Sequence, residues 1–260
     1  MRMSLLRMNG RSVLNNLSRP RVVSVGVVLV ALVLGGVAQA GSHKAAHQDK
    51  AGFEAIFNGK NLEGWSGDAE LWRVEDGAIV GQTTKQNRVS DSNFMIWQGG
   101  TPENFILELE YKIPRGNSGI QYRSFKLDGK HRLGGYQADI DAPGKYAGAN
   151  YGEEYGGMLA NRGQVVTLDD NRNPTTIESL GSVKALGKVI HKDDWNTYRI
   201  IAQGHTLIHQ INGHVTSIVI DNDKDKRRMK GHIGFQLHPG PPMKVMFRRI
   251  RLKRLSIGKN

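Results

Sequence analysis

Two short stretches of the sequence place amide and charged side chains at every second position. Residues 120–123 and 136–141 alternate apolar residues with a polar set, Gln121, Arg123, Gln137, Asp139 and Asp141. Because successive side chains of a β-strand point to opposite faces, an inward Tyr122 and Tyr136 leave all five on the other face. The short connection between the stretches predicts neighbouring strands. The sequence therefore predicts one polar surface with the groups that proton transfer and charge stabilisation require.

Three residues are candidates for the chemistry on that surface. Asp139 is the first candidate for a general base, and Arg123 could stabilise a negative oxygen or bind hydroxyl groups. A nearby Arg123 would lower the pKa of Asp139, whereas partial burial would raise it. His238, in phase with Gln236 on a further strand, is the second acid–base candidate because imidazole titrates near neutrality. Two alternatives stay open: a lone strand Arg or Asp is usually a surface ion pair, and His238 precedes a rigid proline-rich turn.

Period-two patterns also dominate the elements that must position these residues. Alternation runs through residues 105–113 and 232–238, and Asn212-Gly213 is a strong hairpin signal. In residues 245–252 the apolar positions shift by one, which predicts a β-bulge near Arg248. Residues 142–165 are rich in Gly and Asn, alternate poorly, and are interpreted as a loop bordering the site. With no long amphipathic helix after residue 40, the sequence predicts an all-β sandwich of two antiparallel sheets.

Composition excludes several kinds of site. The 260 residues contain no Cys, which excludes disulfides, Cys-ligated zinc, a thiol nucleophile and a lipid-acceptor Cys. The formal charge is +12, and without the five arginines of the first forty residues it is +7. The basic residues from Arg248 to Arg254 alternate with apolar ones, as on a solvated strand face, so no nucleic acid partner is expected. Residues 221–225 are similar to the start of a calcium loop, but Lys226 and His232 stand where that loop needs Gly and Glu, so a charged turn is predicted.

The N-terminus has the pattern of a targeting segment. A basic start is followed by an apolar run from Val22 to Val37 and by Ala38-Gln39-Ala40, a small-x-small cleavage site. The apolar run is short for a membrane span, although a retained anchor is the alternative. We therefore expect a signal peptide over 1–40, a linker over 41–50 and one domain over 51–256. The expected location is periplasmic or secreted, with no stable membrane insertion after cleavage.

Ordered sequence blocks along this domain resemble one family. The blocks are Phe57–Trp65, Trp72–Gly77, Gly116–Arg123, Gly135–Ile140, Trp195–Tyr198, Gly231–His238 and Phe247–Arg251. In order and spacing they resemble the DUF1080 family of 3-keto-disaccharide hydrolases, also described as 3-keto-glucoside lyase/hydratases. The resemblance implies a concanavalin A-like jelly roll and activity on glycosides oxidised at C3.

The implied reaction assigns roles to the candidate residues. A ketone at C3 acidifies the hydrogen on C2, so a base can remove it and the group on C1 can leave by elimination. Water then adds across the double bond, which makes the net result a hydrolysis. This chemistry needs a base, a stabiliser of the enolate oxygen and a proton donor, for which the candidates are Asp139, Arg123 and His238.

A carbohydrate substrate would also need residues that bind it, and side-chain chemistry supplies the candidates, although the loop departs from the family pattern. They are Gln121, Gln137, Asp141 and Gln236 on the strands and Tyr151, Glu153 and Glu154 in the loop. No cofactor is certain, but a divalent cation is possible if Asp139, His238 and Glu153 converge. Two other functions stay open: a non-catalytic, lectin-like carbohydrate-binding module, and an adhesive protein that binds anionic surface polymers through its basic strands. The sequence specifies no oligomeric state.

Overall fold

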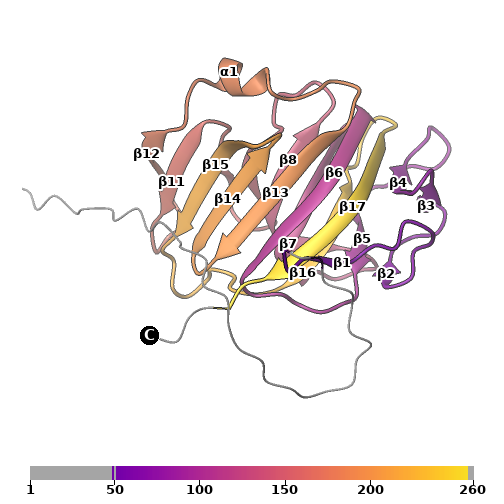
Figure 1. The fold of residues 1–260 in the computed structure, drawn as a ribbon, viewed down its shortest axis with the longest axis horizontal. Helices are drawn as coiled ribbons and strands as arrows, with labels where there is room; N and C mark the ends of the chain where they lie inside the picture. Colours follow the sequence, from indigo (N-terminus) through magenta and orange to yellow (C-terminus); the bar gives the residue numbers. More distant parts are fainter. Residues whose placement is uncertain (1–48, 50, 257–260) are drawn as a thin grey trace, which may run out of the picture. The chain divides into compact units, whose positions relative to one another are not determined.

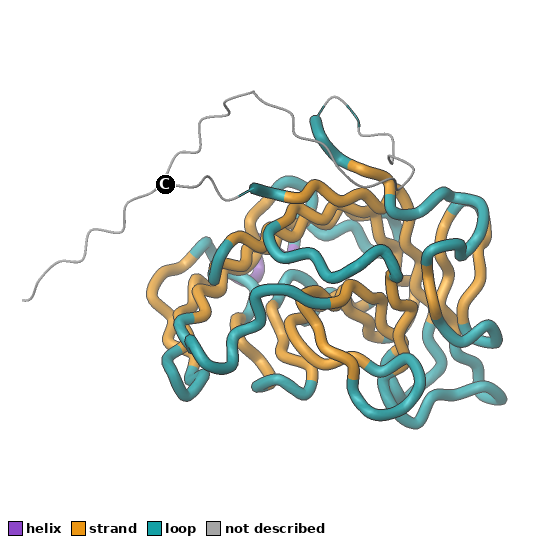
Figure 2. Tube along the Cα trace, turned by 90° about the horizontal axis from the view of Figure 1, so that it is seen from below, coloured by secondary structure: helices purple, strands orange, loops and turns teal. Residues whose placement is uncertain are grey.

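The computed structural model describes Asp49 and residues 51–256, so the predicted signal peptide and most of the predicted linker lie outside the described residues. Alternating apolar positions form the strands, and each strand buries its apolar face. Figure 2 shows mostly strand and loop, with very little helix. That helix, α1 (Val183–Gly187), begins after Ser182, whose side chain accepts a hydrogen bond from the Ala185 N–H, and it buries no residue.

One sheet of the described part has ten strands. They are β1 (Glu54–Ala55), β3 (Trp72–Glu75), β4 (Ala78–Gln82), β6 (Phe105–Arg115), β11 (Gln164–Leu168), β12 (Pro174–Ser179), β13 (Asn196–Gln203), β14 (Thr206–Ile211), β15 (His214–Asp221) and β17 (Lys244–Arg254). Their order is β12-β11-β15-β14-β13-β6-β17-β4-β3, with β1 paired to β17. All pairs are antiparallel except β11 with β15, which run parallel.

The other sheet has seven strands. They are β2 (Trp65–Ser66), β5 (Asn93–Trp97), β7 (Asn117–Lys126), β8 (Leu133–Asp141), β9 (Asn150–Glu153), β10 (Gly157–Ala160) and β16 (His232–Leu237). Their order is β10-β9-β8-β7-β16-β5-β2, and β8 and β7 lie behind β13 and β6 in Figure 1. The prediction of an all-β sandwich of two largely antiparallel sheets is confirmed.

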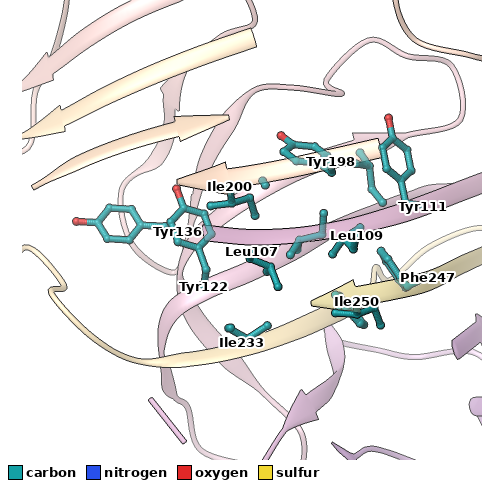
Figure 3. Close-up of a cluster of buried hydrophobic side chains, with 14 of the residues drawn as sticks. Leu107, Leu109, Tyr111, Tyr122, Tyr136, Tyr198, Ile200, Ile233, Phe247 and Ile250 are labelled. Atoms are coloured by element: carbon teal, nitrogen blue, oxygen red, sulfur yellow. The ribbon is translucent and has the colours of Figure 1, made fainter. Parts of the chain in front are cut away.

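The core lies between the two sheets. Figure 3 shows side chains from the ten-stranded sheet, such as Leu107 and Ile200, meeting Tyr122, Tyr136 and Ile233 from the seven-stranded sheet. Burial of this apolar surface is the main stabilisation of the sandwich, at about 25 cal/mol per Å² removed from water. It also decides the direction of every other side chain, because the residues between the core positions must face outward.

Two local predictions have different outcomes. The bulge near Arg248 is confirmed: Arg248 pairs with Glu110 and Arg251 with Glu108, while Arg249 has a left-handed φ of 52°. The interpretation of residues 142–165 as a loop is partly wrong, because β9 and β10 lie within it and extend the seven-stranded sheet. Glycines at 152, 156 and 157 interrupt the alternation there, which hid these strands from a pattern analysis.

No helix in residues 49 and 51–256 is long and apolar enough to cross a lipid bilayer.

Candidate active site on the outer face of the seven-stranded sheet

Polar side chains gather where β16, β7, β8 and β9 lie side by side. Gln121 of β7 pairs with Gln137 of β8, which in turn pairs with Tyr151 of β9. Asp139 pairs with Gly119, two residues further along each of the strands β7 and β8. Since Ile120, Tyr122, Tyr136 and Ala138 are core residues, the residues between them point away from the other sheet. The register therefore brings Gln121, Gln137 and Asp139 together on one face, as the alternation predicts.

Hydrogen bonds connect these side chains into one chain. The Ser124 hydroxyl donates to Gln121 Oε1, and Gln121 Nε2 donates to Gln137 Oε1 over 3.0 Å. Gln137 Nε2 donates to Asp139 Oδ1 over 2.9 Å. All four residues are buried, with 6% of the Asp139 surface exposed. In residues 49 and 51–256, the Gln137 amide is the side-chain donor to this carboxylate, so its second oxygen is left for a ligand.

The electrostatics of Asp139 suit a base that works near neutral pH. Burial is the main cause that raises the pKa of Asp139 to about 7; the Gln137 hydrogen bond opposes this shift, and the nearby Asp141 and Glu153 carboxylates add to it. A carboxyl group of this kind is roughly half ionised at neutral pH. It therefore combines a usable ionised fraction with a much stronger basicity than an exposed Asp has.

Arg123 does not belong to this group. Between Tyr122–Tyr136 and Phe125–Gly134, Arg123 and Ser124 together face the single residue Gly135, which is a β-bulge. Arg123 has a left-handed φ of 47° at this bulge. The regular alternation of side chains is interrupted there, so the prediction that Arg123 shares the face of Gln121 and Asp139 is wrong.

The Arg123 guanidinium is instead committed to the main chain of three loops. It donates to the carbonyls of Glu103 (2.8 Å), Gly204 (2.6 Å) and Arg228 (3.3 Å), and to Asn104 Oδ1 (3.4 Å). The side chain is 1% exposed. The catalytic role expected for Arg123 is therefore replaced by a structural one, and no Arg123–Asp139 pair lowers the pKa of the carboxyl group.

Asp141 is also occupied by the main chain. Its carboxylate accepts the N–H groups of Lys145, Tyr146 and Ala147, each over 2.8 Å. These bonds close the turn that follows β8. The structure thus places Asp141 as a cap of the turn, where its oxygens have partners already, rather than as a residue presented to a carbohydrate.

A groove of about 520 Å³ opens on the same side of the sheet, and two of its lining residues, Tyr151 and Glu153, lie near Asp139. Its walls come from the ends of β9 and β16 and from the loops before β5 and β8; they are Asp91, Ser92, Arg132, Tyr151–Gly157, His238 and Pro239. Tyr151, Glu153, Glu154 and His238 therefore lie together around one hollow. Asp139 is outside this lining and lies two residues along β8 from Gln137, the residue opposite Tyr151.

His238 and Gln236 approach the groove from β16. The exposed His238 ring donates from Nδ1 to the Pro239 carbonyl over 2.6 Å, which fixes the tautomer and leaves Nε2 as an acceptor. Gln236 is 0% exposed, and its Nε2 donates to the Ser92 hydroxyl over 3.0 Å. Gln236 Oε1 is a buried acceptor without a partner among the described residues. The structure thus brings His238 to the rim, whereas Gln236 is buried behind Ser92 of the wall.

Two residues of this site had no signal in the sequence pattern. Arg132, in the turn before β8, supplies the guanidinium of the groove and lies 3.9 Å from Asp91. Gly119 has no side chain, and its role is only visible in space: a Cβ there would lie 2.3 Å from Gln137 Cδ. No periodicity marks a turn arginine or a glycine whose neighbour needs its space.

A larger groove of about 870 Å³ lies on the outer face of the ten-stranded sheet. Its charges are paired with one another: Glu108 contacts Arg199 and Arg251, and Glu110 contacts Arg249. In contrast to Asp139, its carboxylates are saturated by guanidinium groups. We therefore place the candidate site in the smaller groove.

Metal ligands do not cluster in the described part of the chain. No group of three or more His, Asp or Glu side chains there could hold a metal ion. Asp139, His238 and Glu153 thus do not converge into a ligand set. Residues 221–225 form a turn in which Asp221 binds Arg172 over 2.9 Å and accepts the Tyr136 hydroxyl.

Solved structures with the same fold come from Parabacteroides distasonis ATCC 8503. Two crystal structures, described as proposed glycosyl hydrolases, each share 21% identity with this chain. One has a TM-score of 0.53 and covers 78% of this chain and 99% of that chain. The other has a TM-score of 0.52 and covers 79% and 95%. At this identity the likeness shows the fold.

Sequence comparison shows the family. A protein of Bacteroides thetaiotaomicron named 3-keto-disaccharide hydrolase is 33% identical over 94 residues, which are 33% of this chain and 32% of that protein. The match therefore spans about a third of the relative's length. Residues 52–253, almost all of the described part, match one domain family. The chain belongs to the family of the 3-keto-alpha-glucoside-1,2-lyase-like domain.

Proposed function

We propose that this protein is an exported enzyme that cleaves glycosides oxidised at C3, by elimination and hydration with net hydrolysis. The observation that carries the proposal is Asp139, a buried carboxyl group with a pKa raised to about 7, near Tyr151 and Glu153 of a sugar-sized groove. The family of the domain and the name of the Bacteroides thetaiotaomicron relative support the substrate class.

In the first half of the reaction, the Asp139 carboxylate takes the proton from C2 of the keto sugar. The electron pair of the C2–H bond moves toward C1 through an enolate, the C1=C2 bond forms, and the C1–O bond breaks. The Arg132 guanidinium, which lines the groove, is the donor proposed for the enolate oxygen. The leaving oxygen takes up a proton, and the His238 ring at the rim is the candidate donor once it is protonated.

In the second half, water adds across the C1=C2 bond. Its oxygen binds C1 while its proton passes to the neutral His238, and C2 takes back a proton, for which the protonated Asp139 is the source. Asp139 thus returns to the carboxylate, and the sum of both halves is glycoside hydrolysis. Tyr151, Glu153 and Glu154 line the groove and are proposed to hold the sugar through ring stacking and hydroxyl pairs.

The first prediction concerns Asp139 itself. The Asp139→Asn variant should fold but lose at least about a hundredfold in kcat/KM, because an amide cannot accept the C2 proton. In the wild type, kcat/KM should rise with pH to a midpoint near the pKa of Asp139, about 7, because the ionised form is the base. The measurement is sugar release from a 3-keto-disaccharide over a pH series.

A matched control is Glu178→Gln, which removes an exposed carboxylate from β12, away from the groove. Its rate and pH profile should equal those of the wild type. Wild-type rates in Asp139→Asn would contradict the assignment of the base.

A non-catalytic, lectin-like function is the second candidate. It is favoured by Arg123, because the guanidinium expected beside the reacting atoms is bound to three loops instead. This function predicts saturable binding of a disaccharide with no product. The same incubation separates the two, since released sugar from the oxidised disaccharide excludes a purely binding role.

Export rests on residues 1–40, whose basic start, apolar run and Ala38-Gln39-Ala40 site have the order of a signal peptide. N-terminal sequencing of the protein recovered from a periplasmic fraction should begin at Gly41, and recovery of an uncleaved cytoplasmic chain would contradict export.

A further inference from the structure

Asp139 lies at the end of a hydrogen-bonded row that crosses two strands. The row runs from Ser124 through Gln121 to Gln137 and ends on Asp139 Oδ1. We propose that Ser124, Gln121 and Gln137 act as a relay that orients the Asp139 carboxylate and favours its ionised form, and that Gly119 provides the space the relay needs. The inference rests on the proposed function only in giving Asp139 the role of the base.

The ionised carboxylate sets the direction of every bond in the row. A carboxylate can only accept, so Gln137 must present its NH₂ group to it and its oxygen to Gln121. Gln121 must then donate to that oxygen and accept from the Ser124 hydroxyl. Since Gln121 and Ser124 are almost completely shielded from solvent, no water competes for these positions. Aligned bonds of this kind strengthen one another in a medium of low dielectric constant.

Gly119 makes the last bond of the row possible. It pairs directly with Asp139 across β7 and β8, and the Gln137 side chain lies over it. A Cβ at position 119 would lie 2.3 Å from Gln137 Cδ and 2.4 Å from Gln137 Cγ, closer than such atoms can approach. Any side chain there would push the amide away from Asp139. Because the obstructed atoms belong to a flexible side chain, the fold itself can accommodate the change.

The charged and titratable groups around Asp139 make the relay necessary. Asp141 on the same strand and Glu153 on β9 repel a negative charge at Asp139. Tyr151 on β9 and Tyr198 on β13 of the other sheet are the phenols that lie near it. β7 presents Gly119 and Gln121, and β16 presents the neutral Gln236, so no cation from these strands compensates the carboxylate. The hydrogen bond from Gln137, at the end of the relay, is thus the contact that stabilises the ionised form of Asp139.

The test measures the protonation of Asp139 directly, without substrate. The full chain labelled with ¹³C at the aspartate carboxyl carbons is titrated by NMR, and the Asp139 signal is identified by its loss in Asp139→Asn. In Gly119→Ala the midpoint should rise by about one pH unit, the size of one charge-assisted hydrogen bond. Gln137→Ala should give a similar rise. In the Gly119→Ala/Gln137→Ala double variant, the glycine change should add nothing, because no amide is left to displace.

The matched control is Ser118→Ala. Ser118 is a buried serine of β7, the strand that also holds Ser124. Its hydroxyl donates to the Gln236 main-chain carbonyl, which is not part of the relay. It should leave the Asp139 midpoint unchanged, whereas Ser124→Ala should raise it by less than Gly119→Ala does. An unmoved midpoint in a folded Gly119→Ala variant would overturn the relay. If that variant does not fold, an unmoved midpoint in Ser124→Ala would do the same.

Turnover then separates the relay from the proposed function. If Asp139 is the base, kcat/KM of Gly119→Ala on a 3-keto-disaccharide should fall several-fold at neutral pH. It should recover at about pH 9, where the carboxyl group is ionised again. A midpoint that moves by NMR while the activity profile stays in place would support the relay and contradict Asp139 as the base. A merely structural loss of activity would not recover at high pH.

Discussion

Arg123 and Asp139 are both buried charged residues, yet the structure stabilises them differently. The Arg123 guanidinium donates to three main-chain carbonyls and one amide oxygen, so its charge is spread over fixed dipoles. The Asp139 carboxylate has the Gln137 amide as its side-chain donor in the described part of the chain, and burial raises its pKa to about 7. A buried charge with several hydrogen-bond partners supports the fold, whereas one with a single side-chain partner is available for proton transfer.

A substitution at Arg123 tests its structural role. Arg123→Lys keeps the charge but cannot reach three loops at once, so it leaves buried carbonyls without donors. We expect the free energy of unfolding to fall by about 3 kcal/mol, measured by urea denaturation. Arg254→Lys is the control: its side chain is 52% exposed and its partner Glu54 is 3.6 Å away, so a loss below about 1 kcal/mol is expected. A loss as small as the control's would show that the loops do not depend on Arg123.

At the scale of elements, the turn after β8 connects the strand of the base to the strand of the groove. Asp141 accepts three N–H groups of this turn, and Arg162 donates to the carbonyls of Gly144 and Ala147. The turn then leads into β9, and just before that strand the Ala149 carbonyl accepts the Asp139 N–H. Two side chains therefore hold the connection that aligns Tyr151 with Gln137.

Loosening this turn should be visible before the fold is lost. In Asp141→Asn the side chain keeps its shape but loses the charge that strengthens three hydrogen bonds. We expect amide exchange at Lys145, Tyr146 and Ala147 to accelerate roughly tenfold, measured by hydrogen–deuterium exchange. Asp169→Asn is the control, because Asp169 accepts N–H groups from Asn171 and Asn173 in another turn. Equal acceleration at residues 145–147 in both variants would contradict a local role for Asp141.

For the whole molecule, two buried groups give stability opposite dependences on pH. His209 lies in the core with Nε2 near the Tyr122 hydroxyl (2.9 Å) and Nδ1 near the Ala149 carbonyl (3.3 Å). Burial lowers the pKa of His209 from 6.5 to about 3, so the unfolded chain binds its proton first. Stability from His209 is therefore complete above about pH 6.5 and is lost as the pH falls toward 3.

Asp139 acts in the other direction. Its pKa is raised from 3.8 in the reference state to about 7, so the folded chain keeps a proton that the unfolded chain has lost. This contribution is present below about pH 4 and is lost as the pH rises through 7. Between about pH 4 and 6.5 the two effects oppose each other, each at about 1.4 kcal/mol per pH unit.

Single substitutions should separate these effects. Relative to the wild type, Asp139→Asn should gain stability as the pH rises from 4 to 7, by on the order of 4 kcal/mol. His209→Gln keeps a donor and an acceptor in the core, and its stability should decline over the same range compared with the wild type. Chemical denaturation at a series of pH values measures both, and parallel curves for all three proteins would contradict the pKa shifts.

The amino-acid sequence by itself determined the all-β sandwich, its core positions, the bulge near Arg248 and the shared face of Gln121, Gln137 and Asp139. These features follow from alternation, which is local along the chain and is enforced by burial of one strand face. The order and spacing of its sequence blocks also indicated the family. No local pattern, however, shows which residues of a sheet face contact one another.

Only the tertiary structure decided what Arg123, Arg132, Asp141 and Gly119 do. The bulge at Arg123 arises because β7 and β8 pair with unequal numbers of residues, which depends on two strands and not on one. The strands β9 and β10 form because β8 offers them a partner, although their own glycines obscure the pattern. Pairing between segments that are distant in the sequence determines the strand register, the turns and which side chains contact one another. The arrangement of polar groups on this face therefore depends on the tertiary structure.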